Sequence, residues 1–131
     1  MADNQTSAQK DMLEHIFALQ HSFQQELIEH RHLEGISPQE WIQKQTLAMI
    51  SELAELLDEV NFKWWKNPKP VDAHALKEEL VDILHFFVSM CLSAGMDAKE
   101  LYDIYLEKNK ENILRQEGKG KKDGYDVSKM E

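Results

Sequence analysis

Four stretches of helically spaced apolar residues, separated by helix-breaking residues, constrain this chain most strongly. In residues 8–31 the apolar positions recur every three or four residues, which is the spacing of one helix face. Gly35 interrupts that pattern, and similar patterns occupy residues 37–65, 72–95 and 97–117. The sequence therefore predicts four helices, the first of which presents Met12, Ile16, Leu19, Phe23 and Leu27 on one face.

Start and stop signals frame these helices. Ser37, Pro38 and Glu40 form an N-cap, a favourable first helical residue and a capping-box partner. Asp97 and Glu100 repeat the cap and partner at the fourth helix. The turn at 67–70, which reads Asn-Pro-Lys-Pro, ends the second helix, and Gly95 ends the third.

Four amphipathic helices with short connections indicate an all-α fold. Neither period-two alternation nor an Asn-Gly hairpin signal competes with it. We expect a four-to-five-helix bundle in which the second and third helices run antiparallel across the turn at 67–70. Residues 1–117 would form one domain, and residues 118–131 a flexible basic tail.

Charge and composition exclude several classes of function. The formal net charge is −9, which is unfavourable for binding nucleic acid through phosphate contacts. The single cysteine, Cys91, lies in an apolar run and is expected to be an inert buried thiol. The polar N-terminus lacks a signal-peptide core, and no apolar run approaches ~20 residues. We therefore expect a cytoplasmic protein that associates with neither nucleic acid nor a membrane.

Two matched carboxylate pairs are the strongest functional signal. Glu52 and Glu55 lie three residues apart on the second helix, and Glu79 and Asp82 lie three apart on the third. At ~100° per residue, each pair flanks its helix's apolar stripe at the same two angles. Antiparallel packing of the two helices would allow all four carboxylates to converge.

Converging carboxylates repel one another, which raises their pKa values unless a cation is bound. Oxygen ligands suit Mg²⁺, with Mn²⁺ as a possible substitute, and Mg²⁺ commonly shares a few carboxylates with substrate phosphates. The spacing therefore favours a divalent metal site at Glu52, Glu55, Glu79 and Asp82.

Alternative interpretations remain open at this point. Glutamates three residues apart also occur on solvated helix faces, as in a non-catalytic helical interaction module. Asp82 and His85 imitate the Glu-x-x-His motif of di-iron bundles, but the second helix has no matching histidine.

The carboxylate pairs resemble the signature of the all-α NTP pyrophosphatase superfamily, which includes MazG-like proteins and dimeric dUTPases. Three further motifs resemble the dimeric dUTPase branch, and the resemblance covers residues 17–116. They are Leu19-Gln20, the run Phe62-Lys63-Trp64-Trp65-Lys66, and the series Tyr105, Lys108, Asn109, Asn112, Arg115 and Gln116.

The resemblance implies hydrolysis of dUTP to dUMP and pyrophosphate by a homodimer that uses Mg²⁺. Glu52 and Glu55 would be the catalytic residues, with Glu55 accepting a proton from the attacking water. The nearest alternative within the superfamily is a MazG-like enzyme that hydrolyses dCTP or several dNTPs.

The resemblance also assigns the residues that hold the nucleotide. The base pocket would be formed by Gln20, Trp64 and His85. The phosphates would be held by residues of the fourth helix, where Lys and Arg neutralise charge and Asn donates hydrogen bonds. These residues are Tyr105, Lys108, Asn109, Asn112 and Arg115.

Overall fold

The computed structural model describes residues 11–120, and within them all regular structure is helical. The predicted all-α class is therefore confirmed. Residues 8–10 of the first predicted helix and residues 121–131 of the predicted tail lie outside the described residues. The helices are α2 (Met12–Arg31), α3 (Pro38–Glu59), α4 (Ala73–Ser93) and α5 (Ala98–Gln116).

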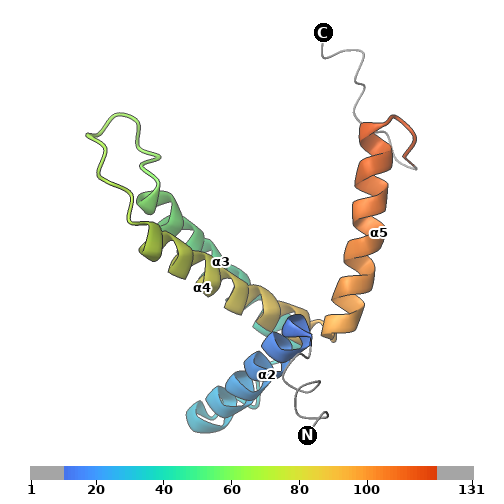
Figure 1. Ribbon diagram of the computed structural model, residues 1–131. Helices are drawn as coiled ribbons and strands as arrows, with labels where there is room; N and C mark the ends of the chain where they lie inside the picture. Colours follow the sequence, from blue (N-terminus) through green and yellow to red (C-terminus); the bar gives the residue numbers. More distant parts are fainter. Residues whose placement is uncertain (1–10, 121–131) are drawn as a thin grey trace, which may run out of the picture. The chain divides into compact units, whose positions relative to one another are not determined.

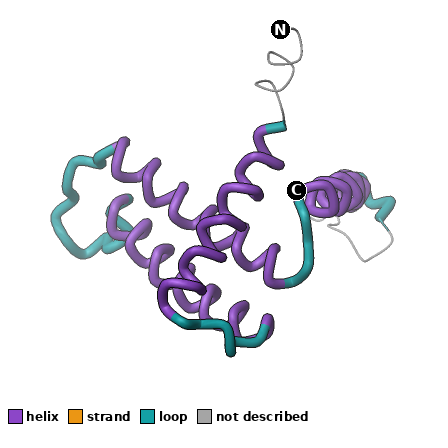
Figure 2. The backbone as a smooth tube through the Cα atoms, turned by 90° about the horizontal axis from the view of Figure 1, so that it is seen from below, coloured by secondary structure: helices purple, strands orange, loops and turns teal. Residues whose placement is uncertain are grey.

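The described chain divides into two compact units between Met96 and Asp97. In the first unit, α3 and α4 lie side by side and antiparallel, as predicted, and α2 crosses α4 (Figures 1 and 2). The second unit contains α5 and is described by itself. The boundary of a single domain at residue 117 stays a prediction.

Apolar burial in the first unit is concentrated where α2 meets α4. Phe17 of α2 and Val88 and Cys91 of α4 are its buried apolar side chains among the described residues. Burial also raises the pKa of the Cys91 thiol, which fits the inert thiol predicted for this position. Within residues 11–120, no single helix is long and apolar enough to cross a membrane.

The predicted N-caps of α3 and α5 are confirmed. Ser37 Oγ accepts a hydrogen bond from the Glu40 backbone N–H at 3.2 Å. At α5, Asp97 Oδ1 accepts from the Glu100 N–H at 2.8 Å. Each cap satisfies a backbone donor that has no partner inside its helix, and so fixes where the helix begins.

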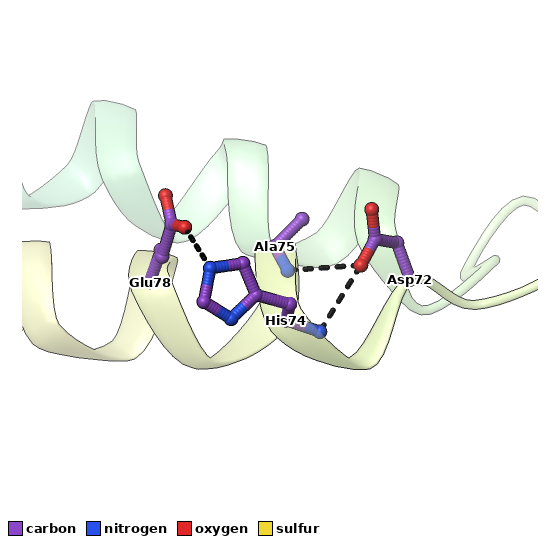
Figure 3. Close-up of polar contacts among 4 residues, drawn as sticks. All are labelled: Asp72, His74, Ala75 and Glu78. Carbon is purple, nitrogen blue, oxygen red and sulfur yellow. Dashed lines mark hydrogen bonds and ion pairs between the residues drawn. The ribbon is translucent and has the colours of Figure 1, made fainter.

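Asp72 caps α4 in the same way, immediately after the proline-containing turn. Its Oδ1 accepts from the backbone N–H groups of His74 and Ala75 at 3.0 and 3.1 Å (Figure 3). The side chain of His74 pairs with Glu78, one turn further along the exposed face of the helix (Figure 3). The Asp72 cap fixes where α4 begins, seven residues before Glu79.

The prediction that the second helix extends to residue 65 is wrong, because α3 ends at Glu59. Asn61 adopts a left-handed conformation with φ 55°, which a helix does not accommodate. Its side chain donates to the Lys69 carbonyl at 2.7 Å and accepts from the Lys69 N–H at 2.9 Å. This clamp closes the loop between α3 and α4, so Trp64 and Trp65 lie in the loop.

We predict that Asn61→Ala lowers the free energy of unfolding by about 1 to 2 kcal/mol, because it removes two hydrogen bonds and places alanine at positive φ. Urea denaturation measures this change. Asn67→Ala, an exposed residue of the same loop, is the control and should change stability by less than about 0.5 kcal/mol. Equal losses in the two variants would contradict the proposed clamp.

Candidate active site

Three of the four predicted carboxylates come together where α3 packs against α4. Glu52 and Glu55 of α3 and Glu79 of α4 each offer one carboxylate oxygen, and these oxygens all lie within 4.8 Å of one another. The three-residue spacing places the two α3 side chains on neighbouring angles, and the antiparallel packing brings Glu79 to them. Glu52 and Glu79 are half-buried, whereas Glu55 is exposed.

Two of these carboxylates contain buried oxygens that lack a protein donor. With the carboxylates ionised, Glu52 Oε2 and Glu79 Oε2 are buried and have no hydrogen-bond donor in the described part of the chain. An unpaired buried acceptor is unfavourable, and a cation satisfies it as well as a donor does. The cluster offers hard oxygen ligands without nitrogen or sulfur, which is the donor set that Mg²⁺ prefers. These residues therefore fit a divalent magnesium-like cation.

Mutual repulsion shifts the titration of the cluster. The pKa of Glu52 is raised chiefly because its protonated carboxyl forms a hydrogen bond with Glu79, and secondly by burial. The pKa of Glu55 is raised first by the negative charge of Glu52 and then by a hydrogen bond to the same residue. The charge of Asp82 raises both pKa values further, which places the fourth predicted carboxylate in the same electrostatic environment.

A cavity of about 620 Å³ extends from these carboxylates between α2, α3 and α4. Glu52 and Asp82 form part of its wall. The rest is largely apolar and aromatic, with a few amide and hydroxyl groups, as is common in small-molecule sites. Its other lining residues are Ile16, Leu19, Gln20, Phe23, Gln24, Leu27, Trp41, Gln45, His85, Phe86 and Ser89.

Two of the three residues predicted to bind the base line this cavity. Gln20 comes from α2 and His85 from α4. The side chain of Gln20 is anchored, because its Nε2 donates to Ser89 Oγ at 2.8 Å. An amide held in this way is preorganised to present its remaining hydrogen-bonding groups to a ligand.

Trp64 does not join Gln20 and His85 in the cavity wall. It lies in the loop between α3 and α4, is 86% exposed, and contacts Trp65 edge-on at a ring separation of 5.7 Å. The premature end of α3 explains this position. A different tryptophan, Trp41 in the first turns of α3, lines the cavity instead.

The predicted phosphate-binding residues lie on α5, in the second unit. Lys108, Asn109, Asn112 and Tyr105 are exposed, while Arg115 is half-buried and its Nε lies 3.8 Å from Glu111 Oε1. Because that unit is described by itself, their contact with a nucleotide stays a prediction.

Several residues of the cavity wall were not predicted from the sequence. Gln24 follows Gln20 by four residues, and Ser89 follows His85 by four, so helical periodicity alone places each beside a predicted site residue. That signal was available once α2 was assigned to the site. Trp41 offers no comparable signal, because its inward position depends on how α3 packs.

Comparison with known proteins gives a family and two groups of relatives. The sequence model of the family described as dUTPase matches residues 12–100. A dCTP pyrophosphatase of Enterobacteria phage T4 is 46% identical over 48 residues, which are 37% of this chain and 28% of the phage protein. A dCTP pyrophosphatase of Enterobacteria phage LZ5 is 32% identical over 75 residues, covering 57% and 44%.

A DNA replication protein of phage T4 is also 46% identical, over 41 residues that make up 31% of this chain and 10% of that protein. This chain thus spans less than half the length of these curated relatives. No solved structure matches the chain.

We predict that Glu52→Gln stabilises the metal-free protein at neutral pH. The raised pKa means that the folded state holds the Glu52 proton more tightly than the unfolded state does. Its stabilising contribution is full at pH values below the ordinary glutamate pKa, about 4.3, and is lost as the pH rises through the raised pKa. The glutamine variant should therefore have a larger free energy of unfolding than the wild type at pH values above the raised pKa of Glu52. This difference should disappear at pH values below the ordinary glutamate pKa.

Urea denaturation in a chelator-containing buffer, repeated across pH, measures this advantage. Glu29→Gln, which removes the same charge from the exposed surface of α2, is the control. A gain in stability that is equal in the two variants would show that net charge, rather than the carboxylate cluster, is responsible.

Proposed function

This chain belongs to the dUTPase family, and on that basis we propose that it hydrolyses a deoxynucleoside triphosphate to the monophosphate and pyrophosphate. The observation that carries the proposal is the carboxylate cluster at the wall of the cavity. Glu52 belongs to both features, so a bound nucleotide would have its phosphates near the carboxylates and its base in the apolar part. The family description supports dUTP as the substrate, whereas the names of the phage relatives support dCTP.

Glu52, Glu55, Glu79 and Asp82 would hold Mg²⁺, with Mn²⁺ as a substitute. When bound, the metal ion would neutralise phosphate charge and acidify the water nucleophile. The two oxygens without protein partners, on Glu52 and Glu79, support this ligand set. Asp82 lies at the cavity wall and contributes negative charge to the cluster.

Glu55 is the proposed general base. It is the exposed member of the cluster, so a water molecule can reach its carboxylate. In the metal-free protein the negative charge of Glu52 raises the pKa of Glu55, so Glu55 accepts a proton more readily than an isolated glutamate does. The water oxygen would attack the α-phosphorus as Glu55 takes its proton. The bond from that phosphorus to the bridging oxygen breaks, and pyrophosphate leaves.

We predict Mg²⁺-dependent release of pyrophosphate from dUTP or dCTP in a panel of dNTPs, and loss of activity on chelation. Glu55→Gln should lower kcat by about 10²- to 10⁴-fold, the usual contribution of a general base. Glu59→Gln, one turn further along α3 and outside the carboxylate cluster, is the matched control and should retain activity. If no nucleotide in the panel is hydrolysed, the proposal is wrong.

A homodimer is the assembly that we propose, because α3 and α4 expose apolar stripes. Leu47 and Ile50 of α3 are 68% and 56% exposed, and Leu80, Leu84 and Phe87 of α4 lie at helical spacing and are also exposed. Several large apolar side chains exposed on neighbouring helices are typical of a protein interface. A second copy of this chain would cover these stripes.

We predict that the protein is a dimer in analytical ultracentrifugation and that Leu47→Glu shifts it toward the monomer. A charge at the centre of an apolar interface is costly to bury, so the dissociation constant should rise at least tenfold. Gln43→Glu adds the same charge at an exposed polar position of α3 and should leave the dimer intact. A monomeric wild-type protein at micromolar concentration would contradict the assembly.

A further inference from the structure

One polar group in the cavity has no role in the proposed chemistry. Gln24 Oε1 is buried and has no hydrogen-bond partner among the residues that the structure describes, although its side chain lines the cavity. Gln24 lies one helical turn after Gln20 on α2, so the two amides belong to the same helix face. Neighbouring Gln20 is anchored on Ser89, whereas the oxygen of Gln24 has no such contact.

The surroundings make this unpaired oxygen a strong constraint on what the cavity binds. Leu19, Phe23 and Phe86 share the wall with Gln24 and offer no donor, and none of the donor-bearing side chains elsewhere in the wall is hydrogen-bonded to Gln24 Oε1. A buried acceptor in apolar surroundings is unfavourable until a donor reaches it. A ligand that brings an N–H to Gln24 removes this cost, while a ligand that brings a carbonyl oxygen adds repulsion.

We propose that Gln24 selects a base with an exocyclic amino group, and therefore cytosine over uracil. The proposal rests on the proposed pyrophosphatase function and deepens it. The proposal places the Gln24 oxygen opposite the exocyclic position of the base, where cytosine carries the N4 amino donor and uracil the O4 acceptor, and not opposite N3, where uracil is the donor. The Gln24 oxygen accepts from that amino group, so dCTP is the preferred substrate.

The preference depends on the orientation of the Gln24 amide that the structure shows, with Oε1 in the buried position. In the rotated orientation an NH₂ group would occupy that position and would favour the O4 carbonyl of uracil. A wild type that prefers dUTP is the result expected of the rotated orientation.

The test is kcat/KM for dCTP and dUTP with Mg²⁺, measured for the wild type, Gln24→Met and Gln25→Met. Methionine keeps the length of the side chain and removes the acceptor. Gln25 is the next residue of α2, is exposed and does not line the cavity, so Gln25→Met is the matched control. We expect the wild type to prefer dCTP and Gln24→Met to lower the dCTP to dUTP ratio by roughly 10- to 100-fold, as when a site loses a hydrogen bond to its substrate. The ratio for Gln25→Met should match that of the wild type.

Binding of the product monophosphates separates base recognition from chemistry. Isothermal titration calorimetry should show tighter binding of dCMP than of dUMP to the wild type, and nearly equal binding to Gln24→Met. If the wild type hydrolyses dUTP with a higher kcat/KM than dCTP, the role proposed for Gln24 is wrong, whereas the proposed pyrophosphatase function is supported. Equal losses on both substrates, with a lowered melting temperature, would show a structural role and also overturn it. No hydrolysis of any triphosphate would overturn the proposed function itself, and this inference with it.

Discussion

The packing of α3 against α4 brings like charges together, and the function proposed for the site depends on that packing. The oxygens of Glu52, Glu55 and Glu79 lie within 4.8 Å of one another, and two of these side chains contain a buried oxygen without a donor. Such an arrangement opposes folding, because each carboxylate raises the cost of ionising its neighbours. It persists because the apolar faces of the two helices, the caps at Ser37 and Asp72 and the Asn61 clamp fix their register. A divalent cation would convert the repulsion into attraction, which is why we propose that the unfavourable cluster is a metal-binding site.

In the proposed function, the helix α2 would give the site its selectivity. It crosses α4, buries Phe17, and contributes Gln20 and Gln24 to the cavity. The carboxylates come from α3 and α4, whereas much of the wall that would face a base comes from α2. Under this proposal, α2 contributes to base preference and no metal ligand, so we expect substitutions of Gln24 to change base preference and to leave metal binding intact.

Local signals in the sequence were sufficient to predict the four helices and the approach of Glu52, Glu55 and Glu79 to one another. The N-caps at Ser37 and Asp97 are set by neighbouring residues, and the spacing of Glu52 and Glu55 fixes their angle on α3. The end of α3 could not be found in this way, because Asn61 is held by Lys69, eight residues away. The same contact removed Trp64 from the predicted pocket.

Trp41 lines the cavity where Trp64 was predicted, which shows that a family resemblance predicts residue types more reliably than it predicts their positions. A motif carries the residue types that a chemistry needs, but the loop that holds Trp64 is positioned by contacts that the motif does not contain. Gln20 and His85 do line the cavity, because each lies on a helix that is positioned by other contacts, Gln20 through Ser89 and His85 through the α3–α4 packing. Glu52 connects the two parts of the site, since its carboxylate belongs to the carboxylate cluster and its side chain to the cavity wall. A ligand that fills the cavity would therefore reach the cluster as well, and the proposed hydrolysis of a base-bearing triphosphate needs both regions within reach of one substrate.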